Sequence, residues 1–484
     1  MRRTLLAATA TAALLVTAGC TTAAVPPEPA GSRDAGILLF QWTWDAIADE
    51  CAALGELGID WVLTSPPQEH VVRDEWWGHY QPVSYLIESR LGTRDEFAAM
   101  VATCAEHEVD IVADAVINHM TGLGTPGTGW AGSTYEHYEY PGIWGPDDFH
   151  QCTESPTGDI IDYRDEAEVQ TCELVNLADL RTGEPHVQER LRAYLDDLLS
   201  LGVAGFRIDA AKHMAPADIA AIIDGLPEGT RVYQEVIRGQ GEPITPEQYL
   251  GNGHVWEFLQ ARTLTSMVES GKLNPDVVFG PEGGSIPSEQ AISFVDNHDT
   301  ERNGETLSYV DGEQYALAIA FLLAHPYGTP QLSSGYAFVG RDAGPQLDDS
   351  GAVLDATCEG ASAAPEPRYD PGTWVCPQRW DVVRGMLAFR SAVGDAPLTD
   401  AVEFDAGDDR TLRAVTGFGR GAFGFVAFNA GPTSAEATFE TSLAPGRYTE
   451  AVSGAVIEVD GSGRFTAEVP GYGVVALHVG VVER

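Results

Sequence analysis

Positive charge is scarce in this sequence. Its 484 residues include 28 Lys and Arg against 72 Asp and Glu, which gives a formal net charge of −44. Such an acidic surface repels the phosphates of nucleic acids and anionic lipids, so we expect neither as a partner. Internal repeats are absent, and no apolar run, including the one near the N-terminus, is long enough to cross a bilayer. The length and the 44% of apolar residues predict a globular protein of two or three domains.

The N-terminal segment has the features of an export signal. Two arginines precede the apolar run Leu5 to Val16, and small residues follow it. We expect residues 1–20 to be a signal peptide whose end resembles a bacterial lipoprotein cleavage box, with a lipid on Cys20. A plain secretory signal is the alternative. Residues 21–34 would form a flexible tether, so the protein is expected to be secreted or lipid-anchored on the outer face of a bacterial membrane.

From residue 37 onward, short apolar runs alternate with helix-like stretches. Strands are expected near 37–41, 61–64, 109–113, 203, 232, 254–256, 291–295 and 330–333. Helices are expected at 46–57, 96–107, 185–201 and 380–393. Short buried strands that alternate with helices predict an α/β fold with a parallel sheet or barrel. So many repeats favour a (β/α)8 TIM barrel, which we place at residues 35–118 and 177–398.

Two regions depart from this alternation. Residues 119–176, after the third strand, are rich in Gly, Tyr, Pro and Asp. An irregular segment this long predicts an inserted subdomain rather than a loop. Residues 399–484 contain short β-prone runs separated by Gly and Pro. This pattern predicts a C-terminal all-β sandwich.

The seven cysteines are an odd number. Without Cys20 an even set remains, which in an exported protein favours three disulfides. Two cysteines share the inserted subdomain, two flank one loop, and the last two lie on the first two barrel helices. We therefore expect the pairs Cys152–Cys172, Cys358–Cys376 and Cys51–Cys104.

Acidic residues follow several of the expected strands. The run at 202–208 includes Arg207 and is followed by Asp209; others lead to Glu235, to Asp299 and to Asp114. Charged groups at the C-terminal ends of barrel strands usually act on a substrate, although Arg207 and Asp209 alone could equally be a structural ion pair. Acids that share one barrel mouth repel, so at least one has a raised pKa. A proton donor beside an ionised carboxylate is what glycoside cleavage requires.

These stretches resemble the motifs of the α-amylase family, glycoside hydrolase family thirteen. The four motifs occur in the family's order at 114–119, 205–213, 235–237 and 294–299. Further stretches at 76–85, 251–253 and 324–328 resemble the animal-type branch, which some bacteria also carry. The resemblance runs from about Gln41 to the C-terminal sandwich. It implies a retaining, endo-acting α-amylase that hydrolyses internal α-1,4-glucosidic bonds of starch or glycogen through a covalent glycosyl-enzyme intermediate.

The resemblance also implies roles for individual residues. Asp209 would be the nucleophile, Glu235 the acid/base, and Asp299 the residue that stabilises the transition state. Arg207 would hold Asp209 ionised. The remaining substrate-binding positions are Trp76, Trp77, Tyr80, Gln81, His119, Lys212, His213 and His298. For Trp76 and Gln81 a purely structural role is the main alternative.

A calcium ion is implied between the barrel and the inserted subdomain. The matching ligands are Asn118 and Asp179 by side chain, and Gln170 and His213 by main-chain carbonyl. Chloride, which many animal-type enzymes bind, is not expected. Arg207 and Asn297 match two chloride-binding positions, but the neutral Gln331 stands where a second basic residue would be needed.

Two other functions fit parts of the sequence. A related α-glucan hydrolase or transglycosylase would release one dominant short product. A non-catalytic glucan-binding lipoprotein would need a lost acid, whereas all three acids are present. In each case the expected partner is an α-glucan polysaccharide or a maltooligosaccharide, and we expect a monomer.

Overall fold

The computed structural model describes residues 27–404 and 411–483. Eight parallel strands close into a barrel, because the first strand pairs with the last, with Gly36 opposite Gln331. This confirms the predicted (β/α)8 TIM barrel. In their order around the barrel the strands are β1 (Ala35–Leu39), β2 (Ile59–Thr64), β3 (Asp110–Ala115), β6 (Gly205–Ile208), β7 (Arg231–Gln234), β8 (His254–Trp256), β9 (Ala291–Phe294) and β10 (Thr329–Tyr336).

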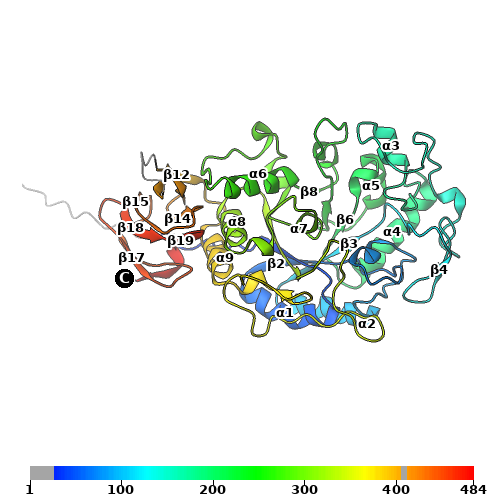
Figure 1. The fold of residues 1–484 in the computed structure, drawn as a ribbon, viewed down its shortest axis with the longest axis horizontal. Coiled ribbons are helices and arrows are strands. Elements are labelled where there is room, and N and C mark those ends of the chain that lie inside the picture. Colours follow the sequence, from blue (N-terminus) through cyan, green and yellow to red (C-terminus); the bar gives the residue numbers. More distant parts are fainter. Residues whose placement is uncertain (1–26, 405–410, 484) are drawn as a thin grey trace, which may run out of the picture.

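Helices surround the barrel (Figure 1). They are α1 (Trp44–Glu56), α2 (Arg94–Glu106), α4 (Pro185–Ser200), α5 (Pro216–Ile223), α6 (Phe258–Glu269), the short α7 (Thr300–Asn303), α8 (Glu313–Ala324) and α9 (Asp381–Val393). Thr93 caps α2 in a capping box with Glu96, which satisfies N–H groups at its first turn. The short strand β11 (Trp374–Val375) pairs with the end of β10.

The barrel interior is filled by side chains that alternate along each strand. Leu38, Trp61, Val112, Tyr233 and Trp256 belong to one buried cluster inside it. A Cβ atom at position 36 would lie 2.0 Å from the Trp61 ring, so only glycine leaves room for that ring. The same alternation places Asp114, Arg207 and Glu235 inside, at the strands' C-terminal ends.

The predicted insertion after the third strand lies between β3 and β6. Its regular structure is limited to β4 (Gly127–Thr128), β5 (Thr134–Tyr135), α3 (Glu166–Thr171) and short 3₁₀ turns. The buried Glu69 carboxylate accepts hydrogen bonds from the main-chain N–H groups of Ala131 and Ser133 and thereby attaches the β4–β5 hairpin to the barrel. All three predicted disulfides are present, Cys51–Cys104, Cys152–Cys172 and Cys358–Cys376.

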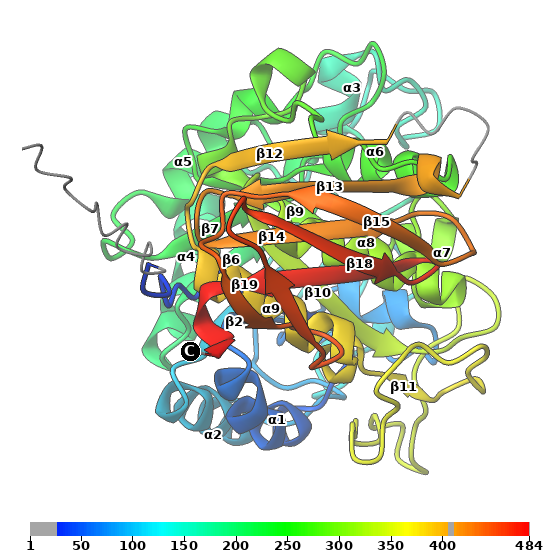
Figure 2. The ribbon, with the colours of Figure 1, turned by 90° about the vertical axis from the view of Figure 1, so that its left-hand side faces the viewer.

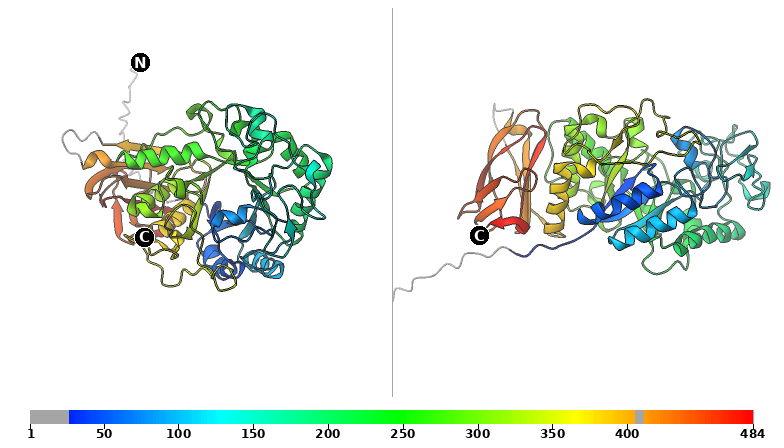
Figure 3. Two further views of the ribbon diagram at one scale, coloured as in Figure 1. Left: turned by 45° about the vertical axis from the view of Figure 1, so that its right-hand side comes forward. Right: turned by 90° about the horizontal axis from the view of Figure 1, so that it is seen from below.

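The C-terminal part is all β, as predicted. One sheet contains β12 (Leu398–Glu403), β13 (Val415–Arg420), β14 (Gly424–Asn429) and β19 (Gly473–His478), and it packs on α8 and α9. The remaining strands are β15 (Ala435–Glu440), β16 (Gly446–Thr449), β17 (Val456–Val459), β18 (Arg464–Val469) and β20 (Val482–Glu483). Figure 2 shows this domain facing the viewer, and Figure 3 shows it beside α9. It lies at the opposite end of the molecule from the insertion (Figure 1).

The predicted signal peptide, Cys20 and the first part of the tether lie outside the described residues. Within residues 27–404 and 411–483, no helix is long and apolar enough to cross a membrane.

Candidate active site

A cavity of about 780 Å³ lies where β3, β6, β7 and β9 end. This is the face at which barrel enzymes carry their active sites. The inserted segment contributes part of its wall through Tyr163 and Leu174. Eleven of the predicted site residues line the cavity: Asp209, Glu235, Asp299, Trp76, Trp77, Tyr80, Gln81, His119, Lys212, His213 and His298.

Arg207 lies behind the cavity, fully buried, and connects three carboxyl groups. Its Nη1 atom donates to Asp114 at 2.8 Å and to Asp209 at 2.5 Å. Its Nη2 atom lies 2.9 Å from Oε1 of Glu235, an ion-pair distance. The Trp256 ring covers the guanidinium, with Cζ 4.7 Å from the ring centre. One cation therefore holds the two predicted reacting carboxylates side by side.

The main chain is strained next to Asp209. Ala210 adopts a left-handed conformation with φ 49° and ψ 30°, which costs free energy for a residue with a Cβ atom. In this conformation its N–H group donates to Oε2 of Glu235 at 2.9 Å. Strain of this kind persists where the surrounding structure enforces it, and here it aligns the strand ends of β6 and β7.

Burial raises the pKa of Glu235, and the neighbouring carboxylates of Asp209 and Asp299 raise it further, while Arg207 opposes the rise. Burial also raises the pKa of Asp209, and Arg207 again opposes the rise through charge and hydrogen bonding. Asp209 gains the shorter, hydrogen-bonded contact with Arg207. Of the two carboxyl groups, Asp209 is therefore the one whose ionised form Arg207 stabilises more directly.

Aromatic rings form the wall beside Asp299. The His298 ring is stacked between Phe40, at 4.8 Å, and Tyr80, at 5.0 Å. Burial lowers the pKa of His298 well below its usual value, so the ring is neutral. Its Nε2 atom lies 3.5 Å from Oδ2 of Asp299. Trp76 meets His298 edge-on at 5.6 Å, which completes an aromatic surface suited to the apolar face of a sugar.

Lys212 and Gln81 join the inserted segment to the barrel. Lys212 forms an ion pair with Glu242, donates to the Ile237 carbonyl, and lies over the Tyr163 ring of the insertion at 5.1 Å. The Gln81 side-chain oxygen accepts hydrogen bonds from the start of the insertion, including the Gly122 N–H group at 3.0 Å. Both residues hold the insertion in place and also line the cavity.

Known sequences resemble this chain over nearly its whole length. A sequence model described as "Alpha amylase, catalytic domain" matches residues 41–241, and one described as "Alpha amylase, C-terminal all-beta domain" matches residues 408–480. An alpha-amylase of Streptomyces violaceus is 42% identical over 476 residues, which are 98% of this chain and 78% of the relative. The chain belongs to the α-amylase family. An alpha-amylase of the insect Tenebrio molitor is also 38% identical over 449 residues, 88% of this chain and 90% of the relative.

A solved structure supports the same α-amylase assignment. Alpha-amylase I of Eisenia fetida superposes with a TM-score of 0.84 and 32% identity, covering 94% of this chain and 99% of that one. A variant of the same protein was solved in complex with maltohexaose. The predicted resemblance to the animal-type branch is thus confirmed, and the chain is a glycoside hydrolase of this family.

The residues predicted to bind calcium fit a hard cation. Burial lowers the pKa of His119 to about 4, so its ring is neutral. Nε2 of His119 lies 2.9 Å from the Tyr80 carbonyl and must donate there, so Nδ1 accepts from the Asn118 amide at 3.2 Å. The Asn118 side-chain oxygen is then free, and it is buried with no hydrogen-bond partner among the described residues. An oxygen oriented in this way suits a cation.

Asp179 is the second side chain that is predicted to bind calcium. Its buried carboxylate follows the end of the insertion, and residue 179 bridges the main chain of His119. Burial raises the pKa of Asp179 to about 7, although His150 donates to it at 2.6 Å. A cation would favour the ionised form. On the other side, Nδ1 of His213 lies 3.1 Å from the Val169 carbonyl, so the helix α3, which contains Gln170, contacts the segment that contains His213.

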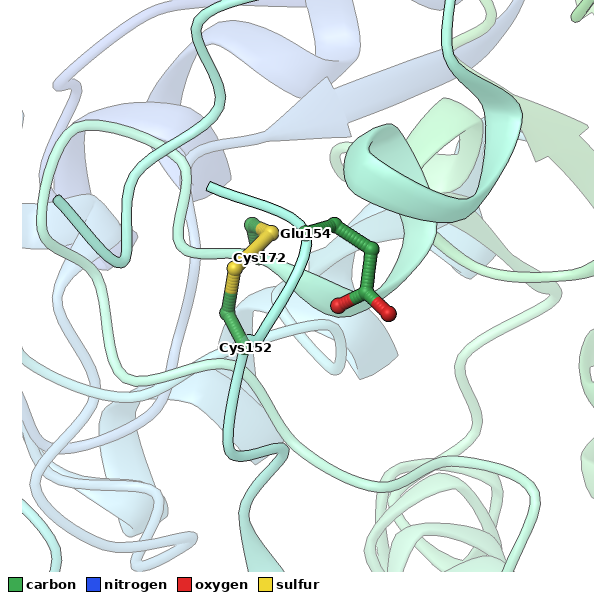
Figure 4. Close-up of side chains that lie close together, drawn as sticks. All are labelled: Cys152, Glu154 and Cys172. Atoms are coloured by element: carbon green, nitrogen blue, oxygen red, sulfur yellow. A yellow bond between two sulfur atoms is a disulfide. The ribbon is translucent and has the colours of Figure 1, made fainter. Parts of the chain in front are cut away.

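Another group with metal-ligand chemistry does not fit a metal. Sulfur and carboxylate atoms of Cys152, Cys172 and Glu154 lie within 4.8 Å of one another. Figure 4 shows that the two sulfur atoms are joined and that Glu154 lies beside them. A disulfide offers no thiolate, so this group is structural.

Several residues line or support the cavity although the sequence indicated no role for them. Asp114 is among the strand-end acids, but its function of holding Arg207 emerges only from the structure. Tyr163, Leu174 and Val175 lie in the insertion, which has no periodic pattern to indicate which side chains face the cavity. The same holds for the loops that contribute the rim residues Arg238, Glu242, Arg341 and Asp342, whereas the rim residue Arg262 lies on α6.

Proposed function

We propose that this protein is a retaining, endo-acting α-amylase that hydrolyses internal α-1,4-glucosidic bonds of starch or glycogen. The observation that carries the proposal is the Arg207 guanidinium, which binds Asp209 and lies 2.9 Å from Glu235 at the floor of the cavity. Retention requires two carboxyl groups about 5–5.5 Å apart, whereas inversion leaves room for a water molecule. Because Asp209 and Glu235 both contact the Arg207 guanidinium, we expect their carboxyl groups to have the short separation of a retaining enzyme.

In the proposed reaction, Asp209 starts in its ionised form and Glu235 starts in its protonated form. Glu235 donates its proton to the glycosidic oxygen as the bond to C1 breaks, and Asp209 attacks C1 to form an ester. Glu235, now ionised, takes a proton from water, which attacks C1, breaks the ester and restores both carboxyl groups. Asp299 stabilises the positive charge that develops on the sugar ring in each transition state.

The surroundings support an α-glucan as the substrate. Tyr80 and Trp77 line the cavity as the resemblance implies and would stack on successive sugars. His119 lines the cavity, and its Nε2 atom donates to the Tyr80 carbonyl, so it would also hold the Tyr80 ring in place for the sugar. The Eisenia fetida relative in complex with maltohexaose is consistent with an oligosaccharide of this class. The three disulfides favour export, and a lipid on Cys20 remains part of the proposal.

Release of reducing sugar from soluble starch tests this function, with the product lengths followed over time. Endo attack gives a mixed ladder of oligosaccharides that shortens with time. One dominant oligosaccharide from the start would favour the related α-glucan hydrolase or transglycosylase. Starch binding without any release would favour the non-catalytic glucan-binding protein.

Calcium removal is expected to lower the melting temperature. When bound, the ion would supply positive charge between Asn118, Asp179 and the carbonyls of Gln170 and His213, and so join the insertion to the barrel. A ligand that binds only the folded state stabilises it by mass action. The measurement is a thermal melt before and after prolonged chelation, with calcium restored as the control. An unchanged melt, or magnesium restoring the melt equally well, would contradict the site.

Activity is expected to be independent of chloride. The charge of Arg207 is already shared among Asp114, Asp209 and Glu235. Gln331 is buried on β10 and adds an amide but no charge, and a desolvated anion needs compensating charge. The measurement is activity in chloride-free acetate buffer, with sodium chloride exchanged in at constant ionic strength. A several-fold rise specific to chloride would contradict the prediction.

A further inference from the structure

Arg302 is a buried arginine close to the cavity that does not line it. Its side chain is 2% exposed. Four aromatic rings surround the guanidinium, and Cζ lies 4.1 Å from the centre of Phe338, 5.1 Å from Phe40, 5.2 Å from Tyr336 and 5.5 Å from Trp76. A guanidinium stacked among rings is held in position by dispersion and cation–π attraction.

This guanidinium is connected to the residues that face the substrate. Its Nη1 atom donates to the His298 carbonyl at 3.1 Å. The main-chain N–H group of Arg302 donates to the Asp299 carbonyl at 3.0 Å, in the first turn of α7. Both hydrogen bonds hold the main chain on either side of the Asp299 side chain.

Two of the four rings around Arg302 also belong to the surroundings of the active site. Phe40 contacts the Arg302 guanidinium and also stacks on His298. Trp76 contacts Arg302 and lines the cavity itself. A change at position 302 would therefore move His298, Trp76 and Asp299 together.

The charge of Arg302 acts on Asp299 as well. Burial raises the pKa of Asp299, and Arg207, Arg302 and Arg341 oppose the rise. The adjacent Glu301 forms an ion pair with Arg302, but burial raises the pKa of Glu301 to about 7. In acid, Glu301 is protonated, so the positive charge of Arg302 is then no longer neutralised by its nearest partner.

We propose that Arg302 is a positioning residue that orients Asp299 and His298 beneath the sugar and holds a buried positive charge close to them. The inference rests on the proposed function, in which Asp299 acts as an anion. The other charged or titratable groups that face Asp299 are Arg207, Arg341, Glu305, His298, Asp209 and Glu235.

The test compares the variants Arg302→Met, Arg302→Lys and Glu301→Gln on soluble starch, with kcat measured across pH. Loss of the charge in Arg302→Met raises the pKa of Asp299, so the acid limb of the profile moves to higher pH. Its kcat is also expected to fall by about a hundredfold, since small misplacements of reacting groups cost this much. Arg302→Lys keeps the charge and loses the planar fork, so its kcat falls while its acid limb stays in place.

Glu301→Gln is the matched control, because it disturbs the same buried contact without changing the charge present in acid. Its acid limb is expected to coincide with that of the wild type. An equal shift in all three variants, or no shift in Arg302→Met, would overturn the inference. If Arg302→Met does not fold, Arg302→Lys alone tests the inference. Because lysine keeps the charge, a shift of its acid limb to higher pH would overturn the inference. An inactive wild type would instead contradict the proposed function.

Discussion

Asp209→Asn is expected to lower kcat on starch by about 10⁴- to 10⁶-fold, as the loss of a nucleophile does in other enzymes that form covalent intermediates. The neutral amide cannot form the ester with C1. Its side-chain oxygen would still accept the hydrogen bond from Arg207, so the fold should be preserved. The measurement is steady-state kinetics together with the melting temperature and circular dichroism of the variant.

A slow substrate makes this prediction more specific. A maltosyl fluoride with a second fluorine on the ring forms the ester quickly, loses its anomeric fluoride and gives an ester that hydrolyses slowly. It should add the mass of one fluorinated maltosyl group to the wild type. Peptide mapping should locate the added mass on Asp209, and Asp209→Asn should gain none. Labelling of Asp299 or Glu235 instead would show that the nucleophile is assigned incorrectly.

Glu235→Gln is expected to lower kcat on starch by about 10²- to 10⁴-fold. The wild-type rate should fall as the pH rises through the raised pKa of Glu235, since the acid form is the one that protonates the leaving oxygen. It should fall again in acid, when the carboxylates of Asp209 and Asp299, whose pKa values are both raised by burial, become protonated. Glutamine cannot titrate, so the alkaline limb should be absent from the residual activity.

A comparison of substrates with different leaving groups distinguishes a variant that lacks only the general acid from one whose whole active site is distorted. Fluoride leaves without protonation, so ester formation from maltosyl fluoride should be affected far less than starch cleavage. Glu257→Gln is the matched control, because Glu257 is also buried with a pKa raised by burial but lies outside the cavity. We expect it to change stability and leave kcat on starch near the wild-type value. Equal losses on both substrates for Glu235→Gln would contradict its role as acid.

The strands that carry the site could be predicted because their signals are local. Each strand is a short apolar run, and Asp209 and Glu235 come directly after one. The disulfides could be predicted for a similar reason, since Cys152 and Cys172 lie in the same inserted segment. In contrast, α8 is buried on all sides and shows no amphipathic period, which is why its sequence gives no clear helical pattern.

What could not be predicted depends on contacts between distant segments. Arg302 is an ordinary arginine in the sequence, and its surroundings come from loops that include Phe40, Trp76 and Phe338. The left-handed conformation of Ala210 has no sequence signal either, because nothing distinguishes this alanine from the next. Both features follow from closure of the barrel, which brings separate strand ends to one place.

The configuration of the first product tests the central claim most directly. Proton NMR can follow the anomeric signals of new reducing ends while starch or a maltooligosaccharide is cleaved faster than the products mutarotate. If Asp209 forms an ester with C1 and water then opens it from the opposite face, two inversions leave the α anomer, which should appear first and only later equilibrate. A β anomer that appears first would mean a single displacement by water and would contradict the assignment of Asp209 as nucleophile.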